Sequence, residues 1–338
     1  MPEPVANMLQ LAKDVCGTQT AKLRVALQRL LQRPDEEAVH DVRVACRRLR
    51  VALRIARKLI GARQVEAIRE RLKDLLTLLG GTRDAEVLAA RAQRLADGGD
   101  RGAAELLRVL RPRTEKQRRL TARRGERSVL TALPGQIAEL IARRPAQSQR
   151  ALKRLATPVA QRAERVLGKR MRTLWQFAEL DGESPAEELH KLRIEMKKLR
   201  YAAEFFAHGL VSEKSEEARG GAARRPLPRL AARRSLRRIA KIAEGYQELL
   251  GNLHDAAVAE ETLTKWQRDG LPWDTPAPKR ETPAGSAASS PAFSLRTLLN
   301  GARKEQASLR REFGEGWGAK PLKKLERAVK AVGTHGRS

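Results

Sequence analysis

The clearest indication of the fold comes from two matching stretches, HDVRVACRRLRVA at residues 40–52 and HKLRIEMKKLRYA at residues 190–202. Both fit the pattern H-x-x-R-x-x-x-(R/K)-(R/K)-L-R-x-A, and they begin 150 residues apart. Such a repeat indicates that the chain contains two related structural units.

A second matching pair supports the duplication. LGGTRDAEV at residues 79–87 matches LGNLHDAAV at residues 250–258. The interval from the motif histidine to the matching aspartate is 21 residues longer in the second unit, which is close to the length of a Gly-, Pro- and charge-rich stretch at 211–232. We therefore predict two helical bundles related by approximate two-fold symmetry, at residues 5–165 and 166–332, with mobile insertions at 211–232 and 270–292.

The apolar pattern predicts an all-α fold. Leucines recur at helical spacing in residues 5–33 and again in residues 65–79, and the alternating Val, Ile and Thr runs typical of strands are missing. Segments around 101–125, 136–180, 233–265 and 293–332 have the same helical character. The expected architecture is a series of helical hairpins packed as bundles.

The charge balance points to an anionic partner. The chain has 69 Lys and Arg against 40 Asp and Glu, which gives a formal net charge of +29. A GC-rich genome would explain the preference for Arg over Lys, but it would not place the cations on selected helix faces. Since 41% of the residues are hydrophobic, the chain has enough apolar material to fold.

Targeting features favour a cytoplasmic protein without a membrane partner. Cys16 and Cys46 form no C-x-x-C pair, so the sequence predicts neither a disulfide framework nor a zinc finger. The first ten residues lack the basic and apolar regions of a signal peptide, and no apolar run is long enough to span a bilayer.

The first motif predicts a helix with a core face and a cationic face. At about 100° per residue, the cationic positions fall within an arc of roughly 80°. These positions are His40, Arg43, Arg47, Arg50 and Arg54. The second motif places its own cationic residues in the same way, at His190, Arg193, Lys197 and Arg200. Between His40 and Lys58 only Asp41 balances seven Arg and Lys residues, so a bound anion would relieve their repulsion.

Two further helices carry shorter basic stripes. Their spacing fits either a solvated face or additional lining of a binding site, and both readings stay open. The residues are Arg162, Arg165, Lys169 and Arg172 in one stripe, and Lys320, Lys323 and Arg327 in the other.

These paired motifs, each followed by an L-G-x-x-(R/H)-D-A turn, resemble the CHAD family, the conserved-histidine α-helical domain, over roughly residues 5 to 330. The resemblance implies two four-helix bundles around a basic central groove that binds inorganic polyphosphate, at polyphosphate granules in bacteria. Carried over by motif, the binding residues are His40, Arg43, Arg47, Arg48, Arg50 and Arg54 with His190, Arg193, Lys197, Lys198 and Arg200.

The second copy departs from the first at two positions. His254 stands where the first copy has Arg83, and both are possible additional lining. Glu204 stands where the first copy has Arg54, which puts the outer end of the second stripe in doubt.

The sequence predicts no catalytic residues, no cofactor and no metal site. Carboxylates and imidazoles at Asp84, His190 and Asp255 offer metal ligands, but both motif histidines have cations three and seven residues later that repel a metal ion. Structural burial and hydrogen bonding to phosphate remain open for the histidines, and crowded cations should disfavour the imidazolium.

Two other functions share the electrostatics. Nucleic-acid binding needs only basic surface, but the few aromatic residues and the missing recognition motifs favour non-specific contact at most. An accessory role in triphosphate or polyphosphate metabolism follows from the resemblance, because this domain is often fused to a CYTH triphosphatase, although the E-x-E-x-K signature of that enzyme is absent. The pattern favours no particular oligomeric state.

Overall fold

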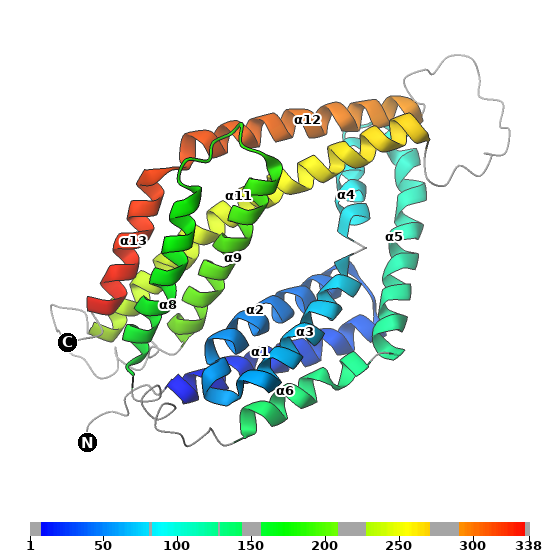
Figure 1. Cartoon of the computed structure of the whole chain (residues 1–338). Helices are drawn as coiled ribbons and strands as arrows, with labels where there is room; N and C mark the ends of the chain where they lie inside the picture. Colours follow the sequence, from blue (N-terminus) through cyan, green and yellow to red (C-terminus); the bar gives the residue numbers. More distant parts are fainter. Residues whose placement is uncertain are drawn as a thin grey trace, which may run out of the picture.

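The computed structural model describes residues 8–80, 83–127, 129–143, 157–208, 228–270 and 291–334. Every regular element within these ranges is a helix, which confirms the predicted all-α class (Figure 1). The α-helices are α1 Met8–Gln32, α2 Glu36–Ile60, α3 Ala62–Leu78, α4 Arg83–Asp97, α5 Arg101–Arg127, α6 Leu133–Ala142, α8 Val159–Leu174, α9 Ala186–His208, α11 Pro228–Asp269, α12 Pro291–Gly316 and α13 Ala319–Thr334. Two short 3-10 helices, η2 Val129–Ala132 and η3 Trp175–Phe177, adjoin α6 and α8.

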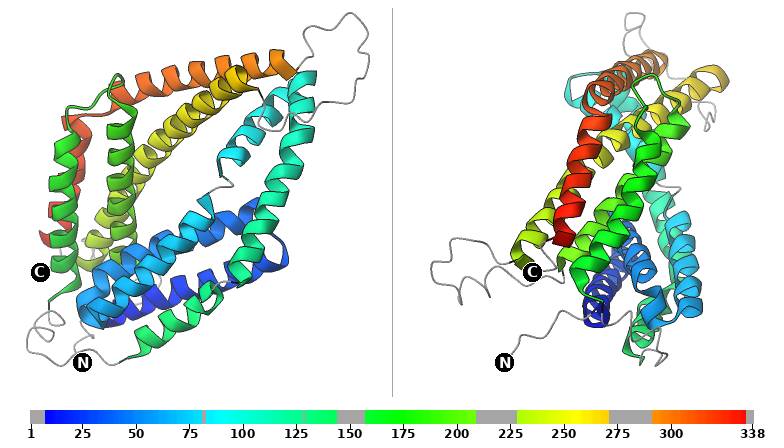
Figure 2. Two further views of the ribbon diagram at one scale, coloured as in Figure 1. Left: turned by 45° about the vertical axis from the view of Figure 1, so that its right-hand side comes forward. Right: turned by 60° about the vertical axis from the view of Figure 1, so that its left-hand side comes forward.

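The helices pack in three groups. α1, α2, α3 and α6 form the first group, and α8, α9, α13 and the first part of α11 form the second. The third group contains α4, α5, α12 and the last part of α11. α11 and α12 are in contact, and the left view of Figure 2 shows the last part of α11 converging with the start of α12 at one end of the molecule. α2 and α9, which carry the two repeated motifs, contact each other where the first two groups meet.

The apolar core consists of two clusters, and the boundary between them does not coincide with the boundary between the two sequence repeats. One cluster of buried residues runs through the first two groups and includes Leu53 on α2, Leu199 on α9 and Leu325 on α13. A second, smaller cluster holds the third group together and includes Leu107 on α5 and Leu299 on α12. Because one cluster joins helices from both halves of the chain, the two separate four-helix bundles stay a prediction.

The predicted boundary between residues 165 and 166 falls inside α8. This helix packs on α9 and on α13, both in the second half of the chain. The predicted insertion at 211–232 lies outside the described residues as far as 227, and its last five residues open α11. Residues 271–290 of the other insertion are also outside the described ranges, and 291–292 open α12.

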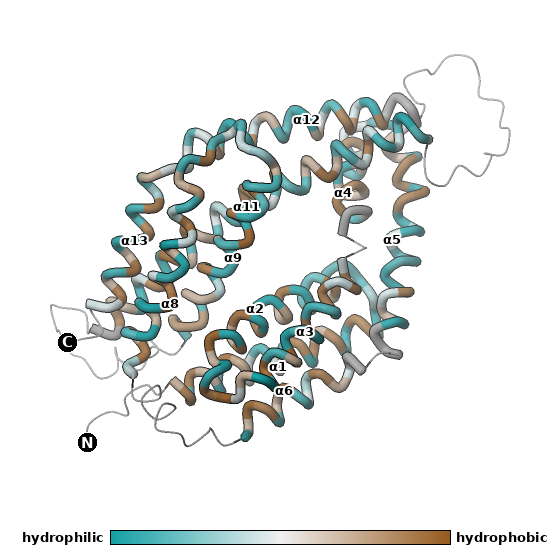
Figure 3. Tube along the Cα trace, viewed as in Figure 1, coloured by the Kyte–Doolittle hydropathy of each residue, from teal (hydrophilic) through white to brown (hydrophobic). Residues whose placement is uncertain are grey.

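α2 shows why its sequence folds as predicted. The side chain of Asp35 accepts a hydrogen bond from the backbone N–H of Ala38 and caps the first turn, and the helix ends at Gly61, whose φ of 116° suits a residue without a side chain. Along α2, Figure 3 shows apolar residues alternating with polar ones. The apolar face, with Val42, Cys46 and Leu49, is buried as the sequence predicts.

Within the described ranges, none of the helices combines the length and the apolar content that a bilayer-spanning segment needs.

Candidate anion-binding site

A basic cavity of about 760 Å³ lies where α2, α3, α8 and α9 converge. Its cationic lining consists of Arg47, Arg50 and Arg54 from α2, Arg69 from α3, Arg162, Arg165, Lys169 and Arg170 from α8, and Lys197 and Lys198 from α9. No acidic residue of the described part of the chain lines it. The cavity therefore gathers cations from both copies of the motif and from a helix between them.

The structure brings together most of the central positions that the sequence singled out. The last three residues of the first stripe, Lys197 of the second stripe and the first three residues of one extra stripe, Arg162 to Lys169, face a single space. Within a stripe, residues three or four apart are separated by roughly 4.5–6 Å along the helix axis. This arrangement can hold an extended chain of negative groups.

The first part of each motif has different surroundings. His40 is exposed and lies outside the cavity. Arg43 is half-buried, and its Nη1 donates a hydrogen bond to the carbonyl oxygen of Leu79 at 2.9 Å. This bond connects α2 to the end of α3, where the L-G pair of the repeat lies.

The equivalent arginine of the second motif lies deeper. Arg193 is only 8% exposed although it falls on the cationic face of its helix pattern. A methyl group in place of the Gly251 hydrogen would lie 3.3 Å from Nη2 of Arg193, so this glycine lets the guanidinium approach α11 directly. In both copies the first motif arginine therefore lies against the L-G pair, and neither lines the cavity.

The second motif histidine is also enclosed. The rings of His190 and His254 have their centroids 4.8 Å apart and are tilted by 51°. Burial lowers the pKa of His190, and the charges of Arg193 and Lys197 lower it further. The imidazole is thus disfavoured in its charged form, as the sequence predicts, but burial is the largest cause.

Glu204 joins the two halves of the chain. It accepts one hydrogen bond from Nε of Arg48 at 3.1 Å and another from Nε of Arg200 at 2.8 Å. Arg200 also forms an ion pair with Glu244 on α11. Arg48 and Arg200 are consequently held outside the cavity. The glutamate that interrupts the second stripe is therefore an ionic connection between α2 and α9.

The other predicted lining residues lie elsewhere. Arg172 borders a separate pocket between α8 and α13, together with Trp175. Lys320, Lys323 and Arg327 are exposed on α13, away from the cavity. Arg83 is the first residue of α4, and its side chain is outside the described part of the structure.

Sequence reasoning missed two cations of the cavity. Arg69 on α3 donates from Nε to the carbonyl oxygen of Arg50 at 3.2 Å, and no repeat or stripe marks it. Arg170 forms an ion pair with Glu195 at 3.4 Å, and the same carboxylate pairs with Lys198. The position of Arg170 beside Lys169 in a basic stripe was the only available signal.

The cavity cations raise one another's electrostatic energy. Burial lowers the pKa of the Arg50 guanidinium, and the charge of Arg69 lowers it further. Burial also lowers the pKa of Arg54, with Arg170 and Arg69 as the repelling neighbours. An anion bound among these side chains would offset this repulsion.

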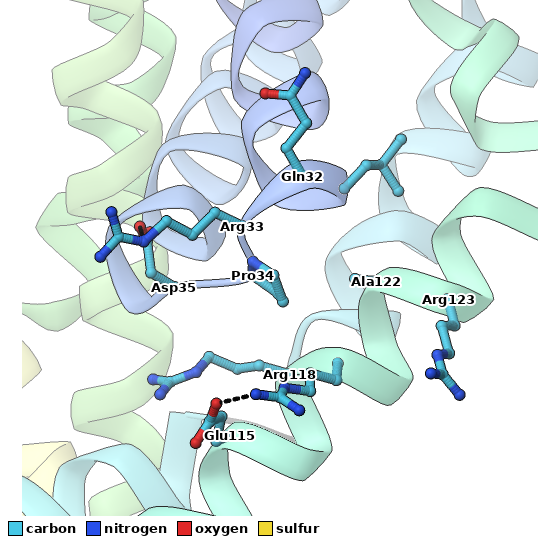
Figure 4. A pocket seen from close by; sticks show the side chains of 10 residues that line it. Gln32, Arg33, Pro34, Asp35, Glu115, Arg118, Ala122 and Arg123 are labelled. Atoms are coloured by element: carbon cyan, nitrogen blue, oxygen red, sulfur yellow. Dashed lines mark hydrogen bonds and ion pairs between the residues drawn. The ribbon is translucent and has the colours of Figure 1, made fainter.

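A second charged pocket lies between α5 and the turn that joins α1 to α2 (Figure 4). Two of its four arginines are paired with acids of the same lining: Arg119 pairs with Glu115, and Arg33 pairs with Asp35. This pocket is therefore less suited to a polyanion than the cavity between α2 and α9.

The described residues contain no group of three or more His, Cys, Asp or Glu side chains placed to hold a metal ion. Cys16 and Cys46 are buried free thiols, and burial raises the pKa of each to about 12. A thiol with such a pKa is not a nucleophile at neutral pH.

Comparison with protein families assigns this fold to a known class. The CHAD domain family model matches residues 15–264, so the chain belongs to the CHAD domain family. The chain is similar to the crystal structure of the CHAD domain from the plant Ricinus communis, with a TM-score of 0.61 and 20% sequence identity over 96% of this chain and 92% of that chain. It is also similar to PptA from Streptomyces chartreusis, with a TM-score of 0.54 and 18% identity over 91% of this chain and 98% of that chain. At these identities the likeness shows a shared fold alone, and the search of curated proteins gave no match.

Proposed function

We propose that this chain binds inorganic polyphosphate in the basic cavity between α2, α3, α8 and α9, without changing it chemically. The observation that carries the proposal is the convergence of Arg47, Arg54, Lys169 and Lys197 from three helices on one space. Arginine suits this role because its planar guanidinium donates two parallel hydrogen bonds to phosphate oxygens.

The cavity favours a repeating anion over a single phosphate. Its cations come from four helices and surround a volume of about 760 Å³, which exceeds what one phosphate group needs. A polyphosphate chain would engage several of them together and release the counterions of each phosphate it neutralises. Binding of this kind would also concentrate the chain at polyphosphate granules.

Nucleic-acid binding is the main alternative. A positive groove attracts any phosphate backbone, but stable binding of single strands also uses rows of stacking aromatic side chains. Tyr201 is the one aromatic residue among the described side chains that line the cavity. We therefore propose that nucleic acid binds only non-specifically, through charge.

We also propose that the chain is not an enzyme. Transfer of a phosphoryl group needs divalent metal ions held by carboxylates. Glu195 lies close to the cavity, but it is already paired with Arg170 and Lys198. Incubation with polyphosphate and Mg²⁺ or Mn²⁺ should release no orthophosphate, and steady release that a cavity substitution abolishes would contradict this part of the proposal.

Calorimetric competition tests the binding itself. The full chain is titrated with long polyphosphate at several salt concentrations, with duplex DNA as the competitor. We expect binding that weakens steeply with salt, and that DNA at equal phosphate concentration does not displace polyphosphate. Displacement by DNA would support the nucleic-acid alternative.

A further inference from the structure

The cavity is not lined by cations alone. Three of its helices also contribute apolar side chains, at Val51, Ile55, Val166, Ile194, Tyr201 and Ala202. Apolar and cationic groups therefore share one space. Inorganic polyphosphate has no apolar surface, so it gains nothing from this part of the lining.

Ile194 is the clearest case. It is 37% exposed, which makes it one of three exposed large hydrophobic residues in the described part of the chain, with Val25 and Leu120. It belongs to neither apolar core cluster, and it lines the cavity. Exposing such a side chain inside a hollow is expected where a ligand covers it.

The size of the cavity is that of a small-molecule site. Ligand pockets are typically roughly 300–1,000 Å³ in volume and combine apolar walls with a few polar groups. The cavity between α2 and α9 lies within this range at about 760 Å³. It can therefore enclose one organic phosphate, whereas a long polyphosphate would extend beyond it.

We propose that the cavity binds a nucleoside oligophosphate, with its phosphates on the arginines and its base against Ile194. This inference rests on the proposed function, because it uses the same cations for the phosphates. A flat base suits the site better than an alkyl chain does, because cations lie within one helical turn of each apolar residue. Arginine side chains also stack on bases through their planar guanidinium groups.

The test compares ATP with inorganic tripolyphosphate on the full chain, by calorimetry without divalent metal at near-physiological salt. Charge alone would favour tripolyphosphate, because it carries more negative charge than ATP. We expect ATP to bind about 5-fold more tightly, because its base covers part of the apolar lining. Equal or tighter binding of tripolyphosphate would overturn the inference.

A pair of matched variants locates the base. Ile194→Ser should weaken ATP binding by about 5-fold and leave tripolyphosphate binding unchanged. Val25→Ser also removes a branched apolar side chain, one that is 64% exposed on α1 and outside the cavity, so it should change neither ligand's binding. Equal effects of Ile194→Ser on both ligands would contradict a contact with the base.

Two further binding measurements distinguish a nucleoside ligand from the other phosphate ligands. Geranyl diphosphate that binds more tightly than ADP would assign the apolar lining to a lipid-like phosphate and overturn the nucleoside assignment. Tight binding of long polyphosphate without any preference for ATP would overturn this inference alone, and weak binding of every phosphate would overturn the proposed function as well.

Discussion

Helices α2 and α9 carry the same motif but use it differently. On α2 the arginines at positions 47, 50 and 54 line the cavity, and within the described part of the chain no ion pair joins their guanidinium groups to an acid. On α9 the equivalent region contains Glu195 and Glu204, which pair with Lys198 and Arg200. Of the two copies of the motif, the first therefore supplies more of the positive charge of the cavity, and the second supplies cations already partly balanced by acids.

The first arginine of each motif differs in the opposite direction, because the arginine on α9 is the more deeply buried of the two. Arg43 on α2 is half-buried, whereas Arg193 on α9 is buried against Gly251. Burial of a charged group is costly unless it is hydrogen-bonded or paired, so such a group is more sensitive to substitution. We therefore expect α9 to contribute more to the stability of the fold and α2 to contribute more to the proposed anion binding.

Charge reversal on α2 should have the largest effect. We expect Arg47→Glu with Arg54→Glu to weaken polyphosphate binding by about 100-fold, because two phosphate-binding cations become repelling acids. Lys197→Glu with Lys198→Glu should weaken it by only about 10-fold, since Lys198 is already paired with Glu195.

Arg57→Glu with Lys58→Glu is the control for net charge. These residues are exposed on the same helix and lie outside the cavity, and the change in charge is identical. In calorimetric titrations of the three variants, the control should bind polyphosphate almost as tightly as the parent chain does. Equal losses in all three would mean that binding depends on total charge and not on the cavity.

Removal of the buried arginine should have the next largest effect. We expect Arg193→Ala to lower the free energy of unfolding by about 2 kcal/mol, because it removes the packing of a buried side chain against Gly251. Arg43→Ala should cost about 1 kcal/mol, because one hydrogen bond from a half-buried group is lost. Urea denaturation measures both, with Lys191→Ala at an exposed position of α9 as the control. A larger loss for Arg43→Ala would reverse the assigned roles of the two helices.

Removal of an acid beside the cavity should have a smaller effect, of the opposite sign. Glu195→Gln frees Arg170 and Lys198, so polyphosphate should bind about 3-fold more tightly at low salt. Glu187→Gln makes the same change at an exposed position that pairs with Lys191, and it should leave the affinity unchanged. The same gain from both variants would indicate a general effect of net charge.

The smallest effect concerns pH. The pKa of His190 is lower in the folded chain than its ordinary value, mainly through burial. The unfolded chain therefore takes up a proton at a higher pH than the folded chain does. His190 thus contributes stability that is complete above its ordinary pKa and is lost as the pH falls through its folded pKa. Urea denaturation between pH 8 and pH 5 should show a smaller loss of stability for His190→Asn than for the parent chain, and parallel curves would contradict this assignment.

Sequence reasoning predicted the helices and the stripes because both depend on local spacing. It did not predict that one stripe changes its surroundings along a single helix: Arg43 and Arg50 share one face of α2, but Arg43 contacts the end of α3 and Arg50 lines the cavity. Such a change depends on where neighbouring helices cross, and the spacing of residues along one helix does not predict those crossings. Arg69 was missed for the same reason, because only tertiary packing brings α3 to the cavity.

The length of α11 has a mechanical consequence. Its 42 residues correspond to about 63 Å of continuous helix. Leu236 and Leu250 belong to the larger apolar cluster, whereas Ala259 and Leu263 belong to the smaller one. Neither cluster can rotate or slide against the other unless this helix bends or breaks. We therefore expect α11 to keep the group of α4, α5 and α12 at a fixed distance from the cavity. Any motion between that group and the cavity should appear first as exchange of amide hydrogens in the middle of α11.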